Sequence, residues 1–495
     1  MSWLTRLLKK KSVPTVSNAP VFFTNTASGK KEVFSSQRAG KVSMYSCGPT
    51  VYSKQHIGNL KAPLFADLVA RVLASAGYRV HRVINITDVG HLVGDGDEGE
   101  DKMDKGARRE GKSAREIAER YASLFLDDLH TLNIDISTIT FPRATEYIKE
   151  QIEMIKTLEA KGVTYRTSDG IYFDVSRFPD YGRLGGVADL MRKEAALAGL
   201  SSRIGENKEK KHPADFALWK FSTKDGNRLQ EWGSPWGAGF PGWHIECSAM
   251  AKSLLGTTLD IHTGGMDHIP VHHNNEIAQS EVVNERPLAR FWMHEAFVTM
   301  QEEKISKSLG NDIYLSDIIE RGYHPLSLRY FFLQAHYRSP ISFTWEALTA
   351  SNEALHRLWK LVSEAKLAAK GRTQPTDESR KMVALLRDDL ATPAALALLW
   401  ECIKDEDLDP AEVWGVVAAA EPVLGLSLLN PPVSAPRTLT GTDIPQEIQE
   451  LLTKRELARQ ARDFATADEL RIHIENRGYH VEDSASGAIV TRRPG

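Results

Sequence analysis

Residues 41 to 87 alternate between two short apolar runs, "KVSMYSC" and "RVHRVINIT", and one long amphipathic run between them. Leu64, Leu68 and Val72 recur at the four-residue spacing of a helix, and Gly77 gives a stop signal. A strand, a helix and a second strand in this order form a βαβ unit with parallel strands. The sequence therefore predicts an α/β fold in which helices cover a parallel sheet.

Length and composition limit the kind of protein further. A chain of 495 residues is too long for one core and suggests about three domains. The net charge of −3 gives no global basic field, so any surface for nucleic acid must be local. The three cysteines cannot form a disulfide framework, which favours a reducing, cytoplasmic setting. No apolar run reaches the roughly 18 to 20 residues that span a bilayer, so no membrane partner is expected.

The rest of the chain divides by pattern. The basic segment 1–20 is interpreted as an extension without function, although a targeting segment or a membrane-surface helix is an alternative. The acidic stretch 94–111 resembles a calcium loop, but Gly99 stands where a ligand is needed, so a solvated loop is expected. Residues 114–160 are expected to be helical, and residues 315–425 mostly helical. Four prolines mark 430–445 as a linker, and two helices and a short β-like tail follow.

A candidate metal site combines residues from distant parts of the chain. His272 and Glu276 lie four apart in "HHNNEIAQS" and would project from one face of a helix. Such pairs are more often surface hydrogen bonds. Cys247 in "PGWHIECSAM" and Cys47 at the end of the first strand would complete a plausible zinc set of two thiolates, an imidazole and a carboxylate. Neither cysteine belongs to a CxxC pair, so spacing alone does not establish the site. Cys402, in an apolar helical stretch, is expected to be a buried core thiol.

Three short motifs indicate a nucleotide site. "HIGN", which contains His56, Gly58 and Asn59, lies where a strand gives way to a helix, and free N–H groups there favour an anion. "KISKSLGN" offers Lys304 and Lys307 to neutralise a polyphosphate, although most such lysine pairs are exposed loops. "HTGGMD" offers two glycines for close approach by a base and a carboxylate for ribose. The two glycines are Gly264 and Gly265, and the carboxylate belongs to Asp267.

The order "CGPTVY…HIGN…NITD…PGWHIECSAM…DIHTGGMDH…HHNNEIAQSE…KISKSLGN…RYFFLQAHYRSPISFT" resembles the cysteinyl-tRNA synthetases, a family of class I aminoacyl-tRNA synthetases, from about residue 21 to 493. HIGN is similar to the class signature HIGH, and KISKS to KMSKS. Asn59 replaces the second signature histidine, Ile305 replaces methionine, and Asn274 replaces the acidic residue often found in HHENE. None of these changes removes a motif.

The resemblance implies a role for each of these positions. The zinc ligands would be Cys47, Cys247, His272 and Glu276, with one ion per subunit. The catalytic residues would be His56, Asn59, Lys304 and Lys307. ATP, with Mg²⁺, would be bound by these four residues together with Gly58, Gly264, Gly265 and Asp267. The pocket for L-cysteine would contain Thr50, Thr87, Trp243 and His244.

The resemblance also implies a domain order. A Rossmann-like catalytic domain would occupy 21–144 and 236–300, with a connective-peptide insertion at 145–235 that is too small to hold a separate hydrolytic domain. A stem-contact region with the KISKS loop (301–345), a helical bundle (346–430), a linker (431–445) and a C-terminal tRNA-binding domain (446–495) would follow.

The implied activity is cysteine–tRNA ligation by a monomer, with cysteinyl-adenylate and pyrophosphate formed first and tRNA(Cys) charged second. Two alternatives are a cysteine ligase of mycothiol biosynthesis, which joins cysteine to an amino sugar, and a catalytically inactive paralogue. The chain beyond the proline-rich linker has no use in a sugar ligase, and the intact motifs argue against an inactive protein.

Overall fold

The computed structural model describes residues 20–89, 102–186, 209–222, 229–300, 303–304, 312–432, 438–439, 444–461, 463–477, 479–484 and 487–492. Its centre is a five-stranded sheet in the order β11-β10-β3-β4-β5, and every neighbouring pair in it is parallel. The strands are β3 (Lys41–Ser46), β4 (Arg79–Ile84), β5 (Ile139–Thr140), β10 (Leu259–Gly265) and β11 (Ala289–Glu295). The predicted α/β fold with a parallel sheet is confirmed.

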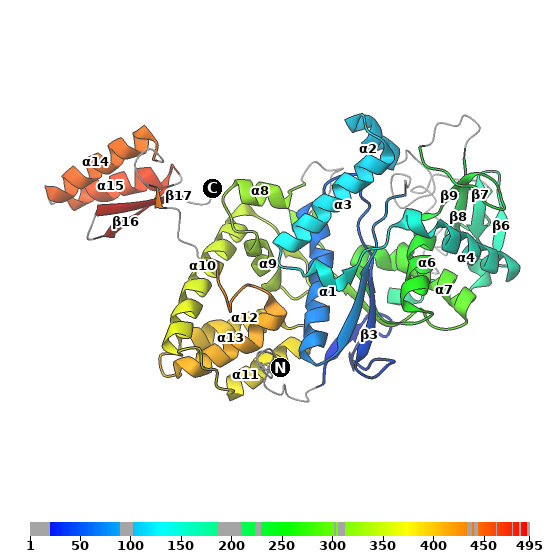
Figure 1. Cartoon of the computed structure of the whole chain (residues 1–495), viewed down its shortest axis with the longest axis horizontal. Coiled ribbons are helices and arrows are strands. Elements are labelled where there is room, and N and C mark those ends of the chain that lie inside the picture. Colours follow the sequence, from blue (N-terminus) through cyan, green and yellow to red (C-terminus); the bar gives the residue numbers. More distant parts are fainter. Residues whose placement is uncertain are drawn as a thin grey trace, which may run out of the picture.

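The predicted βαβ unit is formed by β3, the helix α1 (Ile57–Ser75) and β4. Helix α1 stops where predicted, because Gly77 takes a φ of 90°, which a residue with a side chain rarely adopts. Of the three predicted positions on this helix, Leu64 and Val72 are buried and Leu68 is partly buried. The helix runs beside the sheet, and its N-terminus lies at the carboxyl edge of the strands (Figure 1).

Two expectations for residues 94–160 need correction. Part of the acidic stretch is not a loop, because Lys102–Glu110 forms the helix α2, whose buried Met103 and Ala107 pack toward α3 (Ala114–Thr131). Two apolar positions at helical spacing were enough for a buried face among many charges. The region 114–160 is not helical throughout either, because the edge strand β5 lies between α3 and α4 (Ile148–Ala160).

A second, antiparallel sheet follows in the order β6-β7-β8-β9 and lies to the right in Figure 1. Its core contains Phe173, Trp219 and Ile245, the last of which lies on the helix α6 (Trp243–Leu255). Strand β9 lies just beyond the predicted boundary at residue 235, and the domain boundaries stay predictions. The strands are β6 (Thr164–Arg166), β7 (Gly170–Phe173), β8 (Phe216–Phe221) and β9 (Gly239–Pro241).

The helices α6 (Trp243–Leu255) and α7 (Asn274–Asn284) flank β10 in the sequence. Most of residues 315–425 are helical, as predicted. Cys402 is buried in a hydrophobic core that contains residues of the parallel sheet and of the later helices, also as predicted. The helices are α6 (Trp243–Leu255), α7 (Asn274–Asn284), α8 (Leu315–Glu320), α9 (Leu326–Leu333), α10 (Trp345–Ala368), α11 (Asp377–Arg387), α12 (Thr392–Lys404) and α13 (Pro410–Leu424). The short strands around them are β1 (Phe22–Asn25), β2 (Lys30–Val33), β12 (Val298–Met300), β13 (Glu303–Lys304) and β14 (Ile341–Ser342).

The C-terminal part contains the two predicted helices, α14 (Gln446–Gln460) and α15 (Phe464–Glu475), and a three-stranded sheet. It forms a separate body at the left of Figure 1. Its strands are β15 (Thr438–Leu439), β16 (Tyr479–Ser484) and β17 (Gly487–Arg492). Strand β15 lies within the segment predicted as a linker. Among the helices that the structure describes, none is both long and apolar enough to cross a membrane.

Candidate metal centre and nucleotide site

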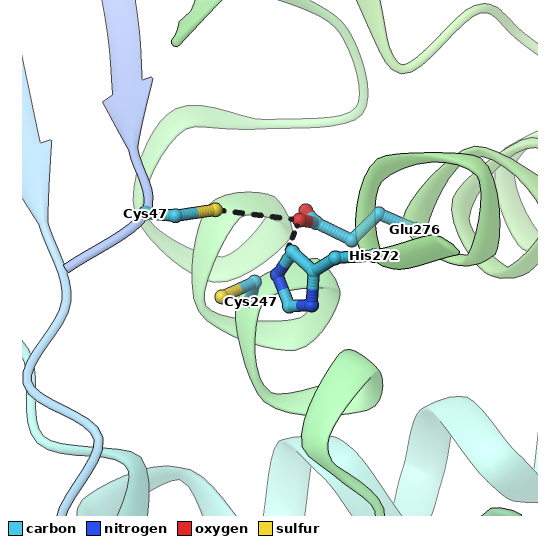
Figure 2. Close-up of side chains that lie close together, drawn as sticks. All are labelled: Cys47, Cys247, His272 and Glu276. Carbon is cyan, nitrogen blue, oxygen red and sulfur yellow. Dashed lines mark hydrogen bonds and ion pairs between the residues drawn. The ribbon is translucent and has the colours of Figure 1, made fainter. Parts of the chain in front are cut away.

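The four predicted metal ligands meet at the carboxyl edge of the parallel sheet (Figure 2). Cys47 directly follows β3, and Cys247 lies on α6. His272 lies in a π-helical turn (Ile269–His273), and Glu276 lies in the first turn of α7. One candidate donor atom from each residue lies within 4.8 Å of the others. The sequence pattern therefore gave a set of side chains that the fold brings together.

Sheet topology explains how residues so far apart in sequence become neighbours. Strands β3 and β10 are adjacent and parallel, and the amide of Cys47 donates to the carbonyl of Thr263 at 3.3 Å. His272 Nε2 lies 2.9 Å from Glu276 Oε1, and Cys47 Sγ lies 3.5 Å from the same oxygen. Cys247, His272 and Glu276 are all buried, so their side chains have few other conformations to adopt.

Burial and mutual charge perturb the pKa values of all four groups. Burial and the neighbouring Cys247 thiol raise the pKa of Cys47 well above its usual range. A hydrogen bond from Cys47 lowers the pKa of Cys247 to about 6. Burial alone would lower the pKa of His272, but attraction to Glu276 and hydrogen bonds to Cys247 and Glu276 raise it to about 10. His262 and His272 hold the pKa of Glu276 below its usual range against the opposite effect of burial. A divalent cation would favour the deprotonated form of every one of these groups.

The donor chemistry fits zinc. Thiolate sulfur and imidazole nitrogen are ligands that Zn²⁺ prefers, and hard cations such as Mg²⁺ and Ca²⁺ bind oxygen instead. Two cysteines, a histidine and a glutamate at this separation are therefore suited to Zn²⁺.

A second group of candidate ligands shares Cys47 and Glu276 with the first and adds His262 and His273. His262 Nε2 lies 3.0 Å from Glu276 Oε2, and His273 Nε2 lies 3.4 Å from Cys47 Sγ. The sequence analysis missed both histidines. A signal was present, because His262 belongs to "DIHTGG" and His273 is adjacent to a predicted ligand. Burial lowers the pKa of His273 well below its usual value, so its imidazole is neutral near pH 7.

Two of the predicted cysteine-pocket residues lie against His272, one of the predicted metal ligands. The Nδ1 atoms of His244 and His272 are 2.8 Å apart, and the rings of Trp243 and His272 have their centroids 4.7 Å apart. A hydrogen bond to the second ring nitrogen fixes the orientation of a metal-bound histidine. His244 is therefore placed to orient the ring of His272.

The other two predicted pocket residues, Thr50 and Thr87, pair with each other in an isolated parallel β-bridge. They continue the line of β3 and β4 beyond the ends of those strands. Thr87 is buried, and its hydroxyl accepts a hydrogen bond from Asn85 Nδ2 at 3.0 Å. The structure thus brings all four predicted pocket residues to the same edge of the sheet as the metal ligands.

The HIGN motif caps α1. His56 is the N-cap residue, and its Nδ1 accepts from the amide of Asn59 at 3.3 Å. The exposed Asn59 donates from Nδ2 to Gln55 Oε1 at 2.8 Å. The segment lies at the N-terminal end of a helix, where the helix dipole favours an anion, although the amides of Ile57 and Asn59 are already hydrogen-bonded within the protein.

The two glycines of "HTGGMD" lie close to side chains of neighbouring residues. A Cβ on Gly264 would lie 2.7 Å from both His268 Nδ1 and His273 Cε1, and one on Gly265 would lie 2.3 Å from Asp267 Oδ1. Their lack of a side chain thus leaves room for these neighbours, a reason that the sequence analysis did not foresee. Lys304 lies in β13, and its side chain is not among those described. Lys307 lies outside the described residues.

Two family models match the chain. A class I tRNA synthetase (C) catalytic domain matches residues 33–353, and a cysteinyl-tRNA ligase anticodon-binding domain matches residues 441–488. Cysteine–tRNA ligase 1 of Burkholderia lata is 46% identical over 470 residues, which are 94% of this chain and 96% of the relative. Cysteine–tRNA ligase of Treponema denticola is 40% identical over 485 residues, covering 93% and 97% of the two chains.

Solved structures share the fold at low identity. Methionyl-tRNA synthetase of Mycobacterium tuberculosis, in complex with methionyl-adenylate, aligns with a TM-score of 0.55 at 16% identity, over 78% of this chain and 92% of its own. A leucyl-tRNA synthetase of Agrobacterium radiobacter aligns with a TM-score of 0.57 at 12% identity, over 81% and 86% of the two chains. The parallel sheet and its helices are therefore an arrangement found in class I synthetases.

Proposed function

The chain belongs to the cysteine–tRNA ligase family of class I aminoacyl-tRNA synthetases, and from this membership we propose that it activates L-cysteine with ATP and transfers it to tRNA(Cys). The observation that carries the proposal is the meeting of Cys47, Cys247, His272 and Glu276 at the sheet edge, beside the N-terminal end of α1. This arrangement supports a thiol-selective site beside an anion-binding site, as the reaction would need.

The reaction balances in two steps. A carboxylate oxygen of cysteine attacks the α-phosphorus of ATP, the bond between the α-phosphorus and its bridging oxygen breaks, and pyrophosphate leaves. A hydroxyl of the terminal ribose of tRNA then attacks the carbonyl carbon of the adenylate, and AMP leaves. No side-chain nucleophile is needed, so positioning and electrostatic stabilisation supply the rate.

The roles of the signature residues follow from their chemistry. His56 and Asn59 can donate hydrogen bonds to phosphate oxygens at the N-terminal end of α1. Lys304 and Lys307 would neutralise the charge that develops on pyrophosphate. Gly58, Gly264, Gly265 and Asp267 would contact the nucleoside, and Mg²⁺ would accompany ATP.

The amino-acid site would be built on the metal centre. Cys47, Cys247, His272 and Glu276 would hold one Zn²⁺, which supplies a binding preference for a thiol over a hydroxyl. Thr50, Thr87, Trp243 and His244 would surround the rest of the amino acid. His244 supports this arrangement through its contact with His272.

The match of residues 441–488 to an anticodon-binding domain favours the synthetase over a cysteine ligase that acts on an amino sugar. The domain boundaries given above, a monomeric state and a cytoplasmic location are part of the proposal. The cytoplasmic location rests on the cysteine usage.

Aminoacylation of total tRNA with each of the twenty amino acids, together with metal analysis of the same preparation, tests the proposal. We expect charging with cysteine alone and one zinc per chain. Charging with another amino acid, or no charging by a folded, zinc-loaded protein, would overturn it. Turnover of an amino sugar in place of tRNA would support the sugar ligase, and no turnover of either acceptor would support the inactive paralogue.

A further inference from the structure

The last residues before the proline-rich linker form a stretch, Leu424–Leu429, that we call the exit segment. It turns out of α13 at Gly425, which has a left-handed φ of 62°. The carboxylate of Glu421 accepts hydrogen bonds at 2.9–3.0 Å from three amides of the segment, those of Leu426, Ser427 and Leu428.

Carbonyl groups of the exit segment are held by four side chains from three other parts of the chain, namely α9, α10 and the turn after α3. The hydrogen bonds are Arg329 Nε to Leu424 O at 2.7 Å, Asn133 Nδ2 to Gly425 O at 2.9 Å, Trp359 Nε1 to Leu426 O at 2.7 Å and Lys366 Nζ to Leu429 O at 2.6 Å. Leu424, Leu426 and Leu428 are fully buried. The point from which the chain leaves for the C-terminal domain is therefore fixed to the body of the protein.

Arg329 connects this segment to helix α1. Its Nη2 donates to Asp67 Oδ2 at 2.8 Å, and its Nη1 donates to the carbonyl of Leu132 at 3.2 Å. Arg329 is 1% exposed and Asp67 is 2% exposed. One guanidinium thus binds α1, the end of α3 and the end of α13, and a Cβ on Gly425 would lie only 2.8 Å from it.

Asp67 is itself shared among three cations. Arg71 Nε lies 2.6 Å and Arg82 Nη1 lies 3.1 Å from its carboxylate, in addition to Arg329. A second path runs from Arg71 Nη2 to the carbonyl of Asn133 at 2.6 Å, and from the side chain of Asn133 to the exit segment.

Stability alone does not account for such a cluster. Buried ion pairs are often matched or exceeded in stability by apolar residues of similar volume. A planar guanidinium adds a fixed geometry toward several acceptors at once. Two of the three elements that Arg329 joins are α1, which carries the HIGN motif at its N-terminus, and the exit segment, which leads to the C-terminal domain.

We propose that Arg329 is a positioning residue for tRNA charging, which holds the exit segment at a set place relative to helix α1. The inference rests on the proposed function. A tRNA held by the C-terminal domain must present its terminal ribose to an adenylate beside HIGN. The exit segment and α1 must therefore keep their spacing. Amino-acid activation uses only the catalytic part and does not need that spacing.

The test compares two reactions in two variants and a control. Arg329→Met removes the donors but keeps the length of the side chain, and Asp67 retains Arg71 and Arg82 as partners. Asn133→Gly removes only the bond to Gly425 O and suits the left-handed φ of 61° at that position. Lys220→Met is the matched control, because it removes a buried cation and its bond to Asp169 in the antiparallel sheet.

We expect Arg329→Met to lower kcat/KM for tRNA by about tenfold, a typical size for coupling between sites, while ATP–pyrophosphate exchange stays within about twofold of the wild type. Asn133→Gly should act in the same direction more weakly. Amide exchange at Leu426, Ser427 and Leu428 should speed up in both variants, and Lys220→Met should change neither the ratio of the two reactions nor this exchange.

Parallel loss of both reactions, or unchanged charging with faster amide exchange, would overturn the inference. If Arg329→Met fails to fold, Asn133→Gly decides between the same outcomes. A wild-type protein that charges no tRNA with cysteine would overturn the proposed function instead, so the two failures are distinguishable.

Discussion

His56 and Tyr314 form an isolated antiparallel β-bridge, although they come from opposite halves of the sequence. The amide of Ile57 donates to the carbonyl of Ile313 at 2.8 Å, and Lys54 Nζ lies 5.0 Å from the centre of the Tyr314 ring. The start of α1 is thereby hydrogen-bonded to the chain just after KISKS. Residues 56 and 57 of HIGN are thus bonded to residues 313 and 314, which follow KISKS in the sequence.

Loss of a predicted metal ligand should abolish activation of cysteine without making serine a good substrate. In Cys47→Ser and His272→Ala we expect zinc per chain and cysteine-dependent ATP–pyrophosphate exchange both to fall to near background. Serine differs little in size from cysteine, and a shape difference of that kind is worth only about 1 to 3 kcal/mol. Zinc content and exchange with both amino acids would be measured, with Cys402→Ser as the control cysteine. A metal-free variant that keeps the wild-type preference for cysteine would refute the idea.

His244→Ala should weaken zinc binding even though His244 is not one of the four ligands. Removing the partner of a metal-bound histidine typically lowers metal affinity by about 10- to 100-fold, and His244 lies 2.8 Å from His272. Competition with a chelator would measure the affinity. His356→Ala, in the helical bundle, is the control. Unchanged affinity in His244→Ala would show that His272 is oriented by other groups.

Gly48→Ala should disturb the metal centre through the backbone. A Cβ at this position would lie 1.7 Å from the carbonyl oxygen of Asn85, so the turn that follows Cys47 must shift. We expect a loss of about 1 to 3 kcal/mol in the free energy of unfolding and a lower zinc content. Gly29→Ala, where nothing lies within 4 Å of the added Cβ, should cost stability without affecting zinc. Equal zinc contents in the two variants would contradict the prediction.

Asp67→Asn should destabilise the protein by about 3 to 5 kcal/mol near pH 7, because it leaves buried cations without their anion. Burial opposes ionisation of Asp67, but Arg329, Arg71 and Arg82 lower its pKa in the folded state. Its stabilising contribution is therefore present above the unfolded pKa of about 3.9 and is lost as the pH falls below that value toward the folded pKa.

Urea unfolding from pH 7 to pH 3 would measure this difference. The gap between wild type and Asp67→Asn should narrow as the pH falls. The exposed pair of Asp377 and Arg380 provides a control, since Asp377→Asn should change stability by less than about 0.5 kcal/mol. A gap that stays constant down to pH 3 would show that the charge of Asp67 is not the cause.

Truncation after Asn430 should separate the two half-reactions. Every residue proposed to contact ATP or cysteine precedes Asn311, so adenylate formation should stay nearly intact. A loss of about 3 kcal/mol in tRNA-binding free energy corresponds to roughly 100-fold lower charging efficiency. ATP–pyrophosphate exchange and tRNA charging would be measured on the shortened chain, with its circular dichroism as a folding control. Full charging efficiency would show that residues 431–495 do not bind tRNA productively.

Local patterns in the sequence were sufficient for the βαβ unit, the helical second half and the two C-terminal helices. The four predicted metal ligands were selected because the motifs that contain them have a recognisable order, and the fold brings these four side chains together. Strand β5 was missed because two residues give no periodicity, and α2 was missed because charges surround its two buried positions. His262 and His273 were missed because their role depends on the adjacency of β3 and β10, which no local pattern specifies.

The metal centre also has a consequence for how the chain matures on the ribosome. Cys47 and Glu276 are separated by 229 residues. At a synthesis rate of about 5 to 20 residues per second, the thiol of Cys47 waits roughly 10 to 45 seconds before its last partner has even been made. During that interval the thiol is an unprotected nucleophile on a nascent chain. A reducing environment during translation would keep this thiol free until the other predicted ligands have been synthesised and can bind zinc with it.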